Sequence, residues 1–485
     1  MDNYLIGEKI DIGTYGEVYK VMRIDTNKKY AMKMFKCNDD DIVSSGVLRE
    51  LCALKTLKHS YIVELMDIFM FEKNDRNYIS VILELCDINL DKYVKDNIPD
   101  RHTAITRFMM ILSALNYMNS MGYVHGDLSP TNIMICGSDI KLIDFNFSRK
   151  IHRKYLRQLP PTINVCPIEI ILNKNPNLLK IDTWSLAAIY YLLTTHENLI
   201  NIRSDNIDEY MKEINEKFGN LSSKINDKLI KRMFQFDNKK RPTVTEIFTM
   251  LKPDMLDRHI SINEPVENYI NYPHMALNIK LDIIHFIIDI IFKNNLNFEI
   301  LVVTFENIMR LYKNDKLGNI YDISNIRIMI FIMIWMVSKV ISDKSWNLDS
   351  VYDFFKKSGI MIDKENITTI HNKLLIDLDW NIDPVTMYSD VCSFSECYNK
   401  YYNMLTFVFI LSDFYETTSI ENKIFIAELI MTDFLKLKNT KKAILDMNNV
   451  CEDIKNSINI PIIIQYAKIN GIDDMLKYLD DLSKN

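Results

Sequence analysis

Three polar residues in the first third of the chain have the types and order needed to move a phosphoryl group. Asp127 and Asn132 lie in one polar segment, and Asp144 follows in Leu142-Ile143-Asp144-Phe145. Phosphoryl transfer needs an acceptor for the proton of the attacking hydroxyl and oxygen ligands for Mg²⁺. Asp127 fits the first role, and Asn132 with Asp144 fits the second. A single Asp or Asn in a loop is more often a turn residue, so the interpretation depends on what surrounds them.

Two features upstream could bind the phosphate groups. Gly13 and Gly16 lie in a segment that ends at Val18; small residues let backbone N–H groups approach phosphates, and Val18 can cover an adenine ring. By itself such a segment is more often a plain turn. Lys33 lies in an otherwise apolar strand and therefore needs a partner, unless it is an exposed edge residue. Glu50, on the next predicted helix, is placed to pair with it.

The elements that must position these residues are predicted from periodicity. The first forty residues contain three short strand-like segments, Val47–Leu57 has a helical pattern, and Tyr78–Leu85 is a further strand. Helical patterns prevail from Thr103 onward. A small β-rich part followed by a larger helical part predicts an α+β domain.

The second half of the chain has a purely helical pattern. The polar segment 253–273 contains Pro265 and Pro273 and is predicted to be a linker. Apolar residues then recur at helical spacing, which predicts helices at Leu277–Phe292, Phe298–Leu311, Ile326–Ile341, Val351–Phe355, Ile367–Leu378, Tyr401–Tyr415 and Ile420–Leu437.

Together these residues resemble the protein kinase set: glycine loop, strand lysine, helix glutamate, H-R-D-x-x-x-x-N and D-F-G. The resemblance implies a two-lobed protein kinase fold, with a small β-rich N-lobe and a helical C-lobe, over residues 1–252. It implies a serine/threonine protein kinase that uses ATP and Mg²⁺, with catalytic roles for Asp127, Lys33 and Glu50 and metal ligation by Asn132 and Asp144. The nucleotide contacts that it implies are Ile10, Gly13, Gly16, Val18, Ala31, Lys33, Leu83, Glu84, Cys86 and Met134.

The match continues downstream. The segment from Thr162 to Glu169 resembles the end of an activation segment, Asp182 begins a D-x-W-S helix, and Arg241 is the expected partner of Glu169. In the family, the residues at the positions of Glu169, Asp182 and Arg241 have structural roles. Thr162 stands where Ser/Thr protein kinases keep a threonine beside the catalytic aspartate, which favours a protein hydroxyl acceptor over a small-molecule substrate.

Within the kinases, the cyclin-dependent group is the most similar. Ser44–Glu50 resembles the helix that cyclins push into place. Residues 274–390 resemble a cyclin box, with Lys339 as its buried lysine and His371 at the position of the paired glutamate. An unrelated five-helix bundle is the plain alternative. Residues 391–485 are predicted to be helical, and one interpretation is a degenerate second cyclin box.

Several positions depart from the kinase pattern. Gly126 replaces the arginine that grips a phosphorylated activation loop in the family, and the activating threonine is replaced by Arg157. The arginine that binds the phosphate and the threonine that carries it are thus both absent. We therefore expect a kinase that is active without phosphorylation of its activation loop. Ser129 replaces the lysine that reaches the γ-phosphate, and Asn146 replaces the glycine of D-F-G. Asp11 replaces the first glycine of the glycine loop. Cys166 replaces an arginine near the pocket that binds the substrate residue after the target Ser or Thr.

Two functions therefore compete. The first is an active kinase held on in cis by its fused cyclin-like domain, with a role in the cell cycle. The second is a pseudokinase scaffold that binds partners without turnover, which the lost residues would allow. The five residues Lys33, Glu50, Asp127, Asn132 and Asp144 are all present and favour the active kinase.

Composition limits the partners and the compartment. With 58 basic and 64 acidic side chains the net charge is −6, which gives no electrostatic reason to expect nucleic acid. The start of the chain lacks a signal-peptide pattern, and the apolar run Ile328–Val337 is too short to span a bilayer. The eight cysteines show no metal-type pairing. We expect a monomer with reduced thiols in the cytoplasm or nucleus, of the host cell if the gene is viral.

Overall fold

The computed structural model describes most of residues 3–386 in two compact units, 1–263 and 264–485. The described range excludes 14–15, 38–41, 73–75, 98, 154–161, 173, 175, 201–211, 213–227, 252–274, 276, 295, 298, 318–322, 343–345 and 385. Arg157, the predicted linker 253–273, and the helices predicted at Tyr401–Tyr415 and Ile420–Leu437 therefore lie outside the described residues.

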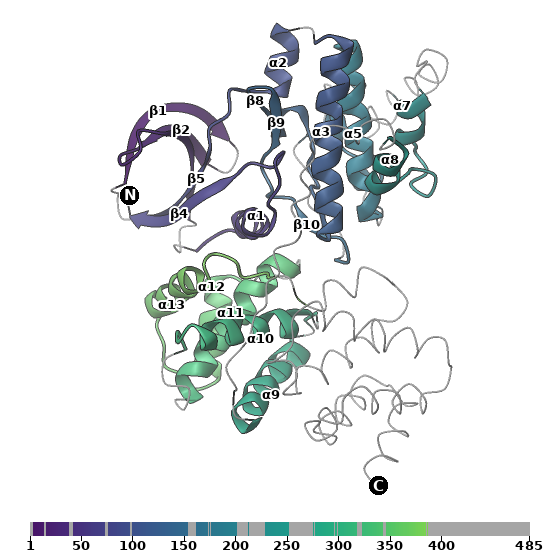
Figure 1. Ribbon diagram of the computed structural model, residues 1–485. Coiled ribbons are helices and arrows are strands. Elements are labelled where there is room, and N and C mark those ends of the chain that lie inside the picture. Colours follow the sequence, from purple (N-terminus) through teal and green to yellow (C-terminus); the bar gives the residue numbers. More distant parts are fainter. Residues whose placement is uncertain are drawn as a thin grey trace, which may run out of the picture. The chain divides into compact units, whose positions relative to one another are not determined.

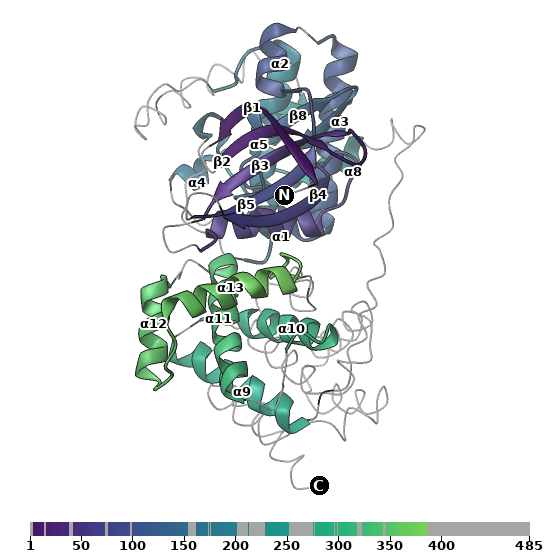
Figure 2. The same cartoon turned by 90° about the vertical axis from the view of Figure 1, so that its left-hand side faces the viewer.

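The first unit begins with a five-stranded antiparallel sheet, seen edge-on in Figure 1 and face-on in Figure 2. Its strands are β1 (Tyr4–Gly13), β2 (Gly16–Arg23), β3 (Lys29–Lys36), β4 (Leu65–Glu72) and β5 (Asn77–Glu84), in the order β1-β2-β3-β5-β4. The three strands predicted in the first forty residues and the one near Tyr78–Leu85 are confirmed. β3 is central, so a side chain on it is surrounded by neighbouring strands.

Helix α1 (Ser45–Thr56) lies between β3 and β4 in the chain. It begins two residues before the predicted Val47 because Ser44 caps it: the Ser44 hydroxyl accepts a hydrogen bond from the Val47 N–H at 3.4 Å. Leu48 and Leu51 are fully buried, which anchors the helix to the N-lobe. Arg49 and Glu50 on the same helix are also buried, and a buried charge needs a partner.

The rest of the first unit is mainly helical (Figure 1). Its helices are α2 (Leu90–Asp96), α3 (Arg101–Ser120), α4 (Ile168–Ile171), α5 (Leu178–Thr195), α7 (Lys228–Met233) and α8 (Val244–Leu251), with 3₁₀ turns at Pro130–Asn132 and Ile163–Val165. Two small antiparallel sheets join them: β6 (Ile88–Asn89), β8 (Ile133–Cys136) and β9 (Asp139–Leu142) form one, and β7 (Tyr123–Val124) and β10 (Arg149–Lys150) form the other. Trp184 is fully buried in the core of this unit, and the centre of its ring lies 3.9 Å from the centre of the Phe234 ring.

The described part of the second unit is all helical, and the five helices predicted before residue 380 are confirmed. They are α9 (Leu277–Lys293), α10 (Glu299–Lys313), α11 (Ile323–Ile341), α12 (Leu348–Lys357) and α13 (Lys364–Asp377). Asn347 and Asp363 cap α12 and α13. Helix α11 contacts α9, α10 and α13 and is the buried centre of the bundle, with Phe331 and Trp335 fully enclosed.

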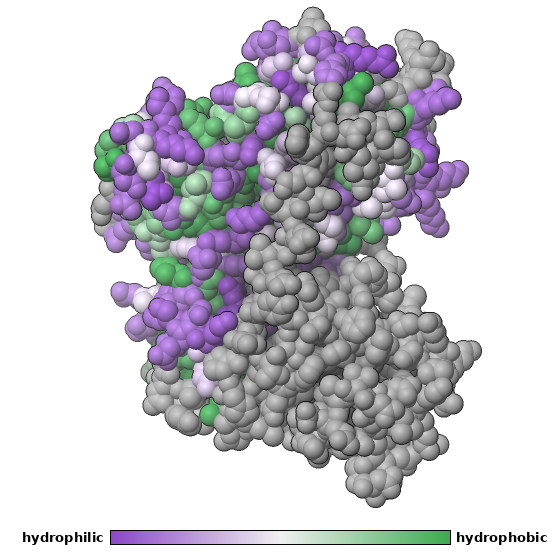
Figure 3. Space-filling view, in the orientation of Figure 1, coloured by the Kyte–Doolittle hydropathy of each residue, from purple (hydrophilic) through white to green (hydrophobic). Residues whose placement is uncertain are grey.

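The surface is mixed in character. On the face shown in Figure 3, hydrophilic side chains predominate over the described surface, and hydrophobic ones appear among the strands of the N-lobe. There Leu5, Ile10 and Ile12 are among the exposed large apolar residues. No helix within the described ranges is long and apolar enough to cross a membrane.

Candidate active site

The first cluster of predicted site residues joins β3, α1 and the segment after β9. The ammonium of Lys33 donates to both carboxylate oxygens of Glu50, at 2.7 and 2.9 Å, and lies 3.6 Å from Oδ1 of Asp144. Burial works against the charge of Lys33, but the two carboxylates outweigh it and raise the pKa of this lysine. The expected Lys33–Glu50 contact is therefore present, and Lys33 stays charged at neutral pH.

The second cluster lies in the loop between β7 and β8. The amide nitrogen of Asn132 donates to the backbone oxygen of Asp127 at 2.9 Å and to its Oδ2 at 3.2 Å, while Thr162 donates a further side-chain hydrogen bond. Burial, together with the charge of Asp144, raises the pKa of Asp127 to about 7 in spite of these hydrogen bonds. A group that gains or loses its proton near neutrality is suited to accepting one.

Hydrogen bonds to α5 fix the backbone of the loop that carries Asp127. Asp182 accepts hydrogen bonds from the backbone N–H groups of His125, at 2.8 Å, and Gly126, at 3.0 Å. The backbone of Gly126 has φ +83°, and a Cβ there would lie 2.5 Å from the carbonyl oxygen of Phe147. A side chain at this position would therefore require that carbonyl to move, which the sequence did not reveal.

The residues predicted to bind Mg²⁺ have the right donors for it. Asn132 uses its amide nitrogen on Asp127, which leaves the amide oxygen as an acceptor. The Asn146 amide and the Lys33 ammonium both approach Oδ1 of Asp144, and a carboxylate has a second oxygen that can ligate a cation. Carboxylate and amide oxygens are hard ligands of the kind that Mg²⁺ prefers, so the donor set fits this ion.

The predicted nucleotide contacts are gathered mainly by strand register. Val18 pairs with Lys33, Ala31 with Leu83, and Tyr30 with Glu84. Of the remaining predicted contacts, Gly13 ends β1, Cys86 follows β5, Met134 lies on β8, and Ile10 is 44% exposed on β1. Gly16 has a packing reason of its own, because a Cβ there would lie 2.2 Å from the carbonyl oxygen of Met34.

The pair expected downstream is confirmed. Arg241 donates to both oxygens of Glu169, at 2.6 and 3.0 Å, and both side chains are buried. This two-point contact ties the end of the activation segment to the turn before α8, which is a structural role.

Two contacts near the site were missed from the sequence. The Nε–H of Arg49 donates to the backbone oxygen of Asn146 at 2.9 Å, and the Asn146 side-chain amide donates to Asp144 Oδ1. An arginine directly before Glu50 on a buried helix was the available signal. Ser129, at the position of the family's lysine, is buried and its hydroxyl lies 2.8 Å from that of Thr131.

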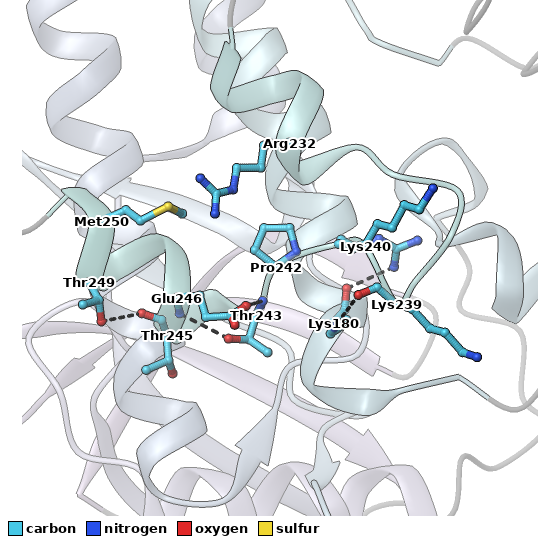
Figure 4. A pocket seen from close by; sticks show the side chains of 11 residues that line it. Lys180, Arg232, Lys239, Lys240, Pro242, Thr243, Thr245, Glu246, Thr249 and Met250 are labelled. Carbon is cyan, nitrogen blue, oxygen red and sulfur yellow. Dashed lines mark hydrogen bonds between the residues drawn. The ribbon is translucent and has the colours of Figure 1, made fainter.

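A separate pocket of about 490 Å³ lies between α7 and α8, away from these residues (Figure 4). Its rim carries Lys180, Arg232, Lys239 and Lys240. The Lys180 ammonium donates to the Lys239 carbonyl at 3.0 Å. None of the predicted catalytic residues lines this pocket, so it does not belong to the candidate active site.

Among the described residues of the second unit, one lysine is buried. Lys339 on α11 is 7% exposed, and its ammonium lies 4.2 Å from the centre of the Trp335 ring. No ion pair joins it to a carboxylate among the described residues, and burial lowers its pKa to about 7. His371 on α13 is also buried, and burial together with the charge of Lys339 lowers its pKa to about 3.

Comparison with known proteins agrees with the first unit. Residues 4–251 match the protein kinase domain, and the chain therefore belongs to the protein kinase family. A putative serine/threonine-protein kinase of Acanthamoeba polyphaga mimivirus is 35% identical over 237 residues, which are 47% of this chain and 36% of that relative.

Two other relatives are cellular. A probable cell division protein kinase of Encephalitozoon cuniculi is 27% identical over 270 residues, 52% of this chain and 98% of the relative. A probable serine/threonine-protein kinase of Dictyostelium discoideum is 30% identical over 264 residues, 52% of this chain and 50% of the relative. The chain thus spans about a third of the mimivirus relative and half of the Dictyostelium one. The family match ends at residue 251, and no match to a cyclin domain accompanies it.

Proposed function

We propose that this protein is an active serine/threonine protein kinase that transfers phosphate from ATP to a hydroxyl group of a protein. The observation that carries the proposal is the joint placement of Asp127 with Asn132 and of Lys33 with Glu50 and Asp144. Family membership and serine/threonine kinase relatives support the same activity.

In this mechanism each residue has one task. Asp127 accepts the proton of the substrate hydroxyl, with its carboxylate held by Asn132 and Thr162. Lys33, kept charged by Glu50, holds phosphate oxygens. Asn132 and Asp144 would hold Mg²⁺, which neutralises charge on the phosphate groups. Because the pKa of Asp127 lies at about 7, it is partly ionised at neutral pH and can act as the acceptor.

The test is transfer of the γ-phosphate to a generic Ser/Thr substrate by the full-length protein, with Asp127→Asn as control. We expect the control to lose about 10²–10⁴-fold in rate, the usual contribution of a positioned proton acceptor. In the unmodified protein the rate should rise with pH as Asp127 becomes ionised, because only the ionised carboxylate accepts a proton. Equal rates in both proteins would contradict the assignment.

We also propose that the helical unit is cyclin-like and keeps the kinase active in cis. The sequence of Ser44–Glu50 supports this, as does the five-helix bundle with a buried lysine on its central helix. A probable cell division protein kinase among the relatives agrees with the cyclin-dependent group. A tether raises the effective concentration of one unit at the other to about the millimolar range, which suits a kinase whose loop phosphosite is replaced by Arg157.

A protease site inserted in residues 253–273 tests this second proposal on the whole chain. After cleavage, activity should fall as the sample is diluted, whereas the uncut protein should keep a constant specific activity. Activity that survives cleavage and dilution would exclude activation in cis. ATP binding without any turnover, in the uncut protein, would instead favour the scaffold function.

A further inference from the structure

We infer that Asn146, at the position of the D-F-G glycine, is a positioning residue that fixes the carboxylate of Asp144 for the metal ion. The inference rests on the proposed function for its nucleotide and metal. Its basis is a chain of hydrogen bonds from α1 through Asn146 to Asp144, all within the kinase unit.

The first link is the side-chain amide. Its nitrogen donates to Oδ1 of Asp144 at 2.5 Å. An ionised carboxylate can only accept hydrogen bonds, so the nitrogen rather than the oxygen of the amide must face it. The bond occupies Oδ1, which also faces Lys33 at 3.6 Å. Because both contacts lie on Oδ1, Oδ2 is the oxygen that we expect to face the cation.

The second link holds Asn146 itself in place. Its backbone oxygen accepts the Nε–H of Arg49 at 2.9 Å, and both residues are buried. Arg49 precedes Glu50 on α1, and Glu50 binds Lys33. The contacts therefore close a ring through α1, β3 and the segment Asp144–Asn146, and the ring restricts where the Asp144 carboxylate can lie.

Stability does not explain an asparagine here. Asn146 is 1% exposed, and its Oδ1 is buried with no hydrogen-bond partner among the described residues. A buried polar atom without a partner costs about 1–3 kcal/mol, and a glycine would avoid that cost. Asn146 is also absent from the positive-φ residues of the described chain, so its backbone does not require glycine in this conformation. The side chain is therefore better explained by its bond to Asp144.

Hydrogen-bond partners of metal ligands typically contribute about 10–100-fold to metal affinity. The experiment titrates Mg²⁺ and follows binding of the fluorescent nucleotide mant-ATP to the full-length protein. Asn146→Leu keeps nearly the same shape and removes the donor. We expect the Mg²⁺ concentration at half-maximal binding to rise about 10–100-fold, while mant-ATP binding in EDTA stays within about twofold.

Gly46→Ala is the matched control. A Cβ at Gly46 would lie 3.8 Å from Asn146 Oδ1, which is an ordinary contact, so the Mg²⁺ midpoint should not move. Asn146→Ala is the second variant, in case the leucine lowers the melting temperature. The inference is overturned by an unchanged midpoint in folded variants, by an equal loss of binding in EDTA, or by an unmodified protein without Mg²⁺ dependence. A shifted midpoint in a protein that transfers no phosphate would leave the inference intact and refute the kinase activity.

Discussion

Lys33 in the kinase unit is partly buried and Lys339 in the helical unit is buried, and their surroundings differ in charge. Lys33 in the kinase unit has Glu50 at 2.7 Å and Asp144 at 3.6 Å, and its pKa is raised. Lys339 in the helical unit has an aromatic ring and a histidine near it, and burial lowers its pKa to about 7. A lysine is thus stabilised by opposite charge in one unit and brought close to neutrality in the other.

The difference separates two reasons for burying a charge. In the kinase unit the carboxylates keep the ammonium charged, as is needed to hold an anionic ligand. In the helical unit the charge of Lys339 acts on His371, which is itself neutral at pH 7 because burial lowers its pKa to about 3. Nothing among the described residues balances a charge on Lys339, so the lysine there costs stability.

The largest effect is expected from Lys33→Met. The change leaves two carboxylates near each other without their cation, and breaking a buried pair costs about 3–5 kcal/mol. Phosphate transfer should fall by about 10²–10³-fold, as for loss of one preorganised donor. Urea unfolding and the transfer assay measure the two effects. Lys36→Met, on the exposed end of the same strand, is the control and should change neither.

Lys339→Met should raise the free energy of unfolding, whereas Lys33→Met should lower it. The change replaces a buried amine that has no carboxylate partner with an apolar side chain of similar length. We expect the free energy of unfolding to rise by about 1–3 kcal/mol. Tryptophan fluorescence reports mainly on this unit, because three of the four tryptophans lie in it, among them Trp335 beside Lys339. The free energy of unfolding of Lys373→Met, which removes an exposed ammonium paired with Asp377, should stay within about 0.5 kcal/mol of the wild type. A loss of stability in Lys339→Met would show that the lysine has a partner.

A third effect is a dependence of stability on pH. An unfolded lysine holds its proton up to about pH 10.4, whereas Lys339 in the folded protein loses it at about 7. Between these values the unfolded state binds more protons, so stability should rise with pH from about 7 to about 10. Unfolding curves across that range, compared between the wild type and Lys339→Met, isolate this contribution by difference.

His371→Glu sharpens the same measurement. A glutamate at the position that faces Lys339 in the resembled family would supply the missing charge and raise the pKa of the lysine. The rise in stability between pH 7 and 10 should then disappear, with little net change at pH 7 because a buried pair roughly repays its own desolvation. Persistence of the pH dependence in this variant would mean that residue 371 does not reach Lys339.

The elements of both units could be predicted well from the sequence wherever hydrophobic periodicity was strong. The strands of the first forty residues and the five helices after Met275 are examples. β4 was not predicted, because its strand Leu65–Glu72 shows no clear alternation in burial. The start of α1 was placed late because a cap depends on one hydroxyl, here that of Ser44, rather than on a repeating pattern.

The sequence alone predicted Lys33, Glu50, Asp127, Asn132 and Asp144 as site residues, because the chemistry of phosphate transfer requires those types in that order. Only the tertiary structure decided how they are held. The ring through Arg49 and Asn146, the support of the catalytic loop by Asp182, and the closed space at Gly126 all join residues far apart in the chain. Such contacts leave no periodic trace, because they depend on where separate elements meet and not on the order of residues within any one of them.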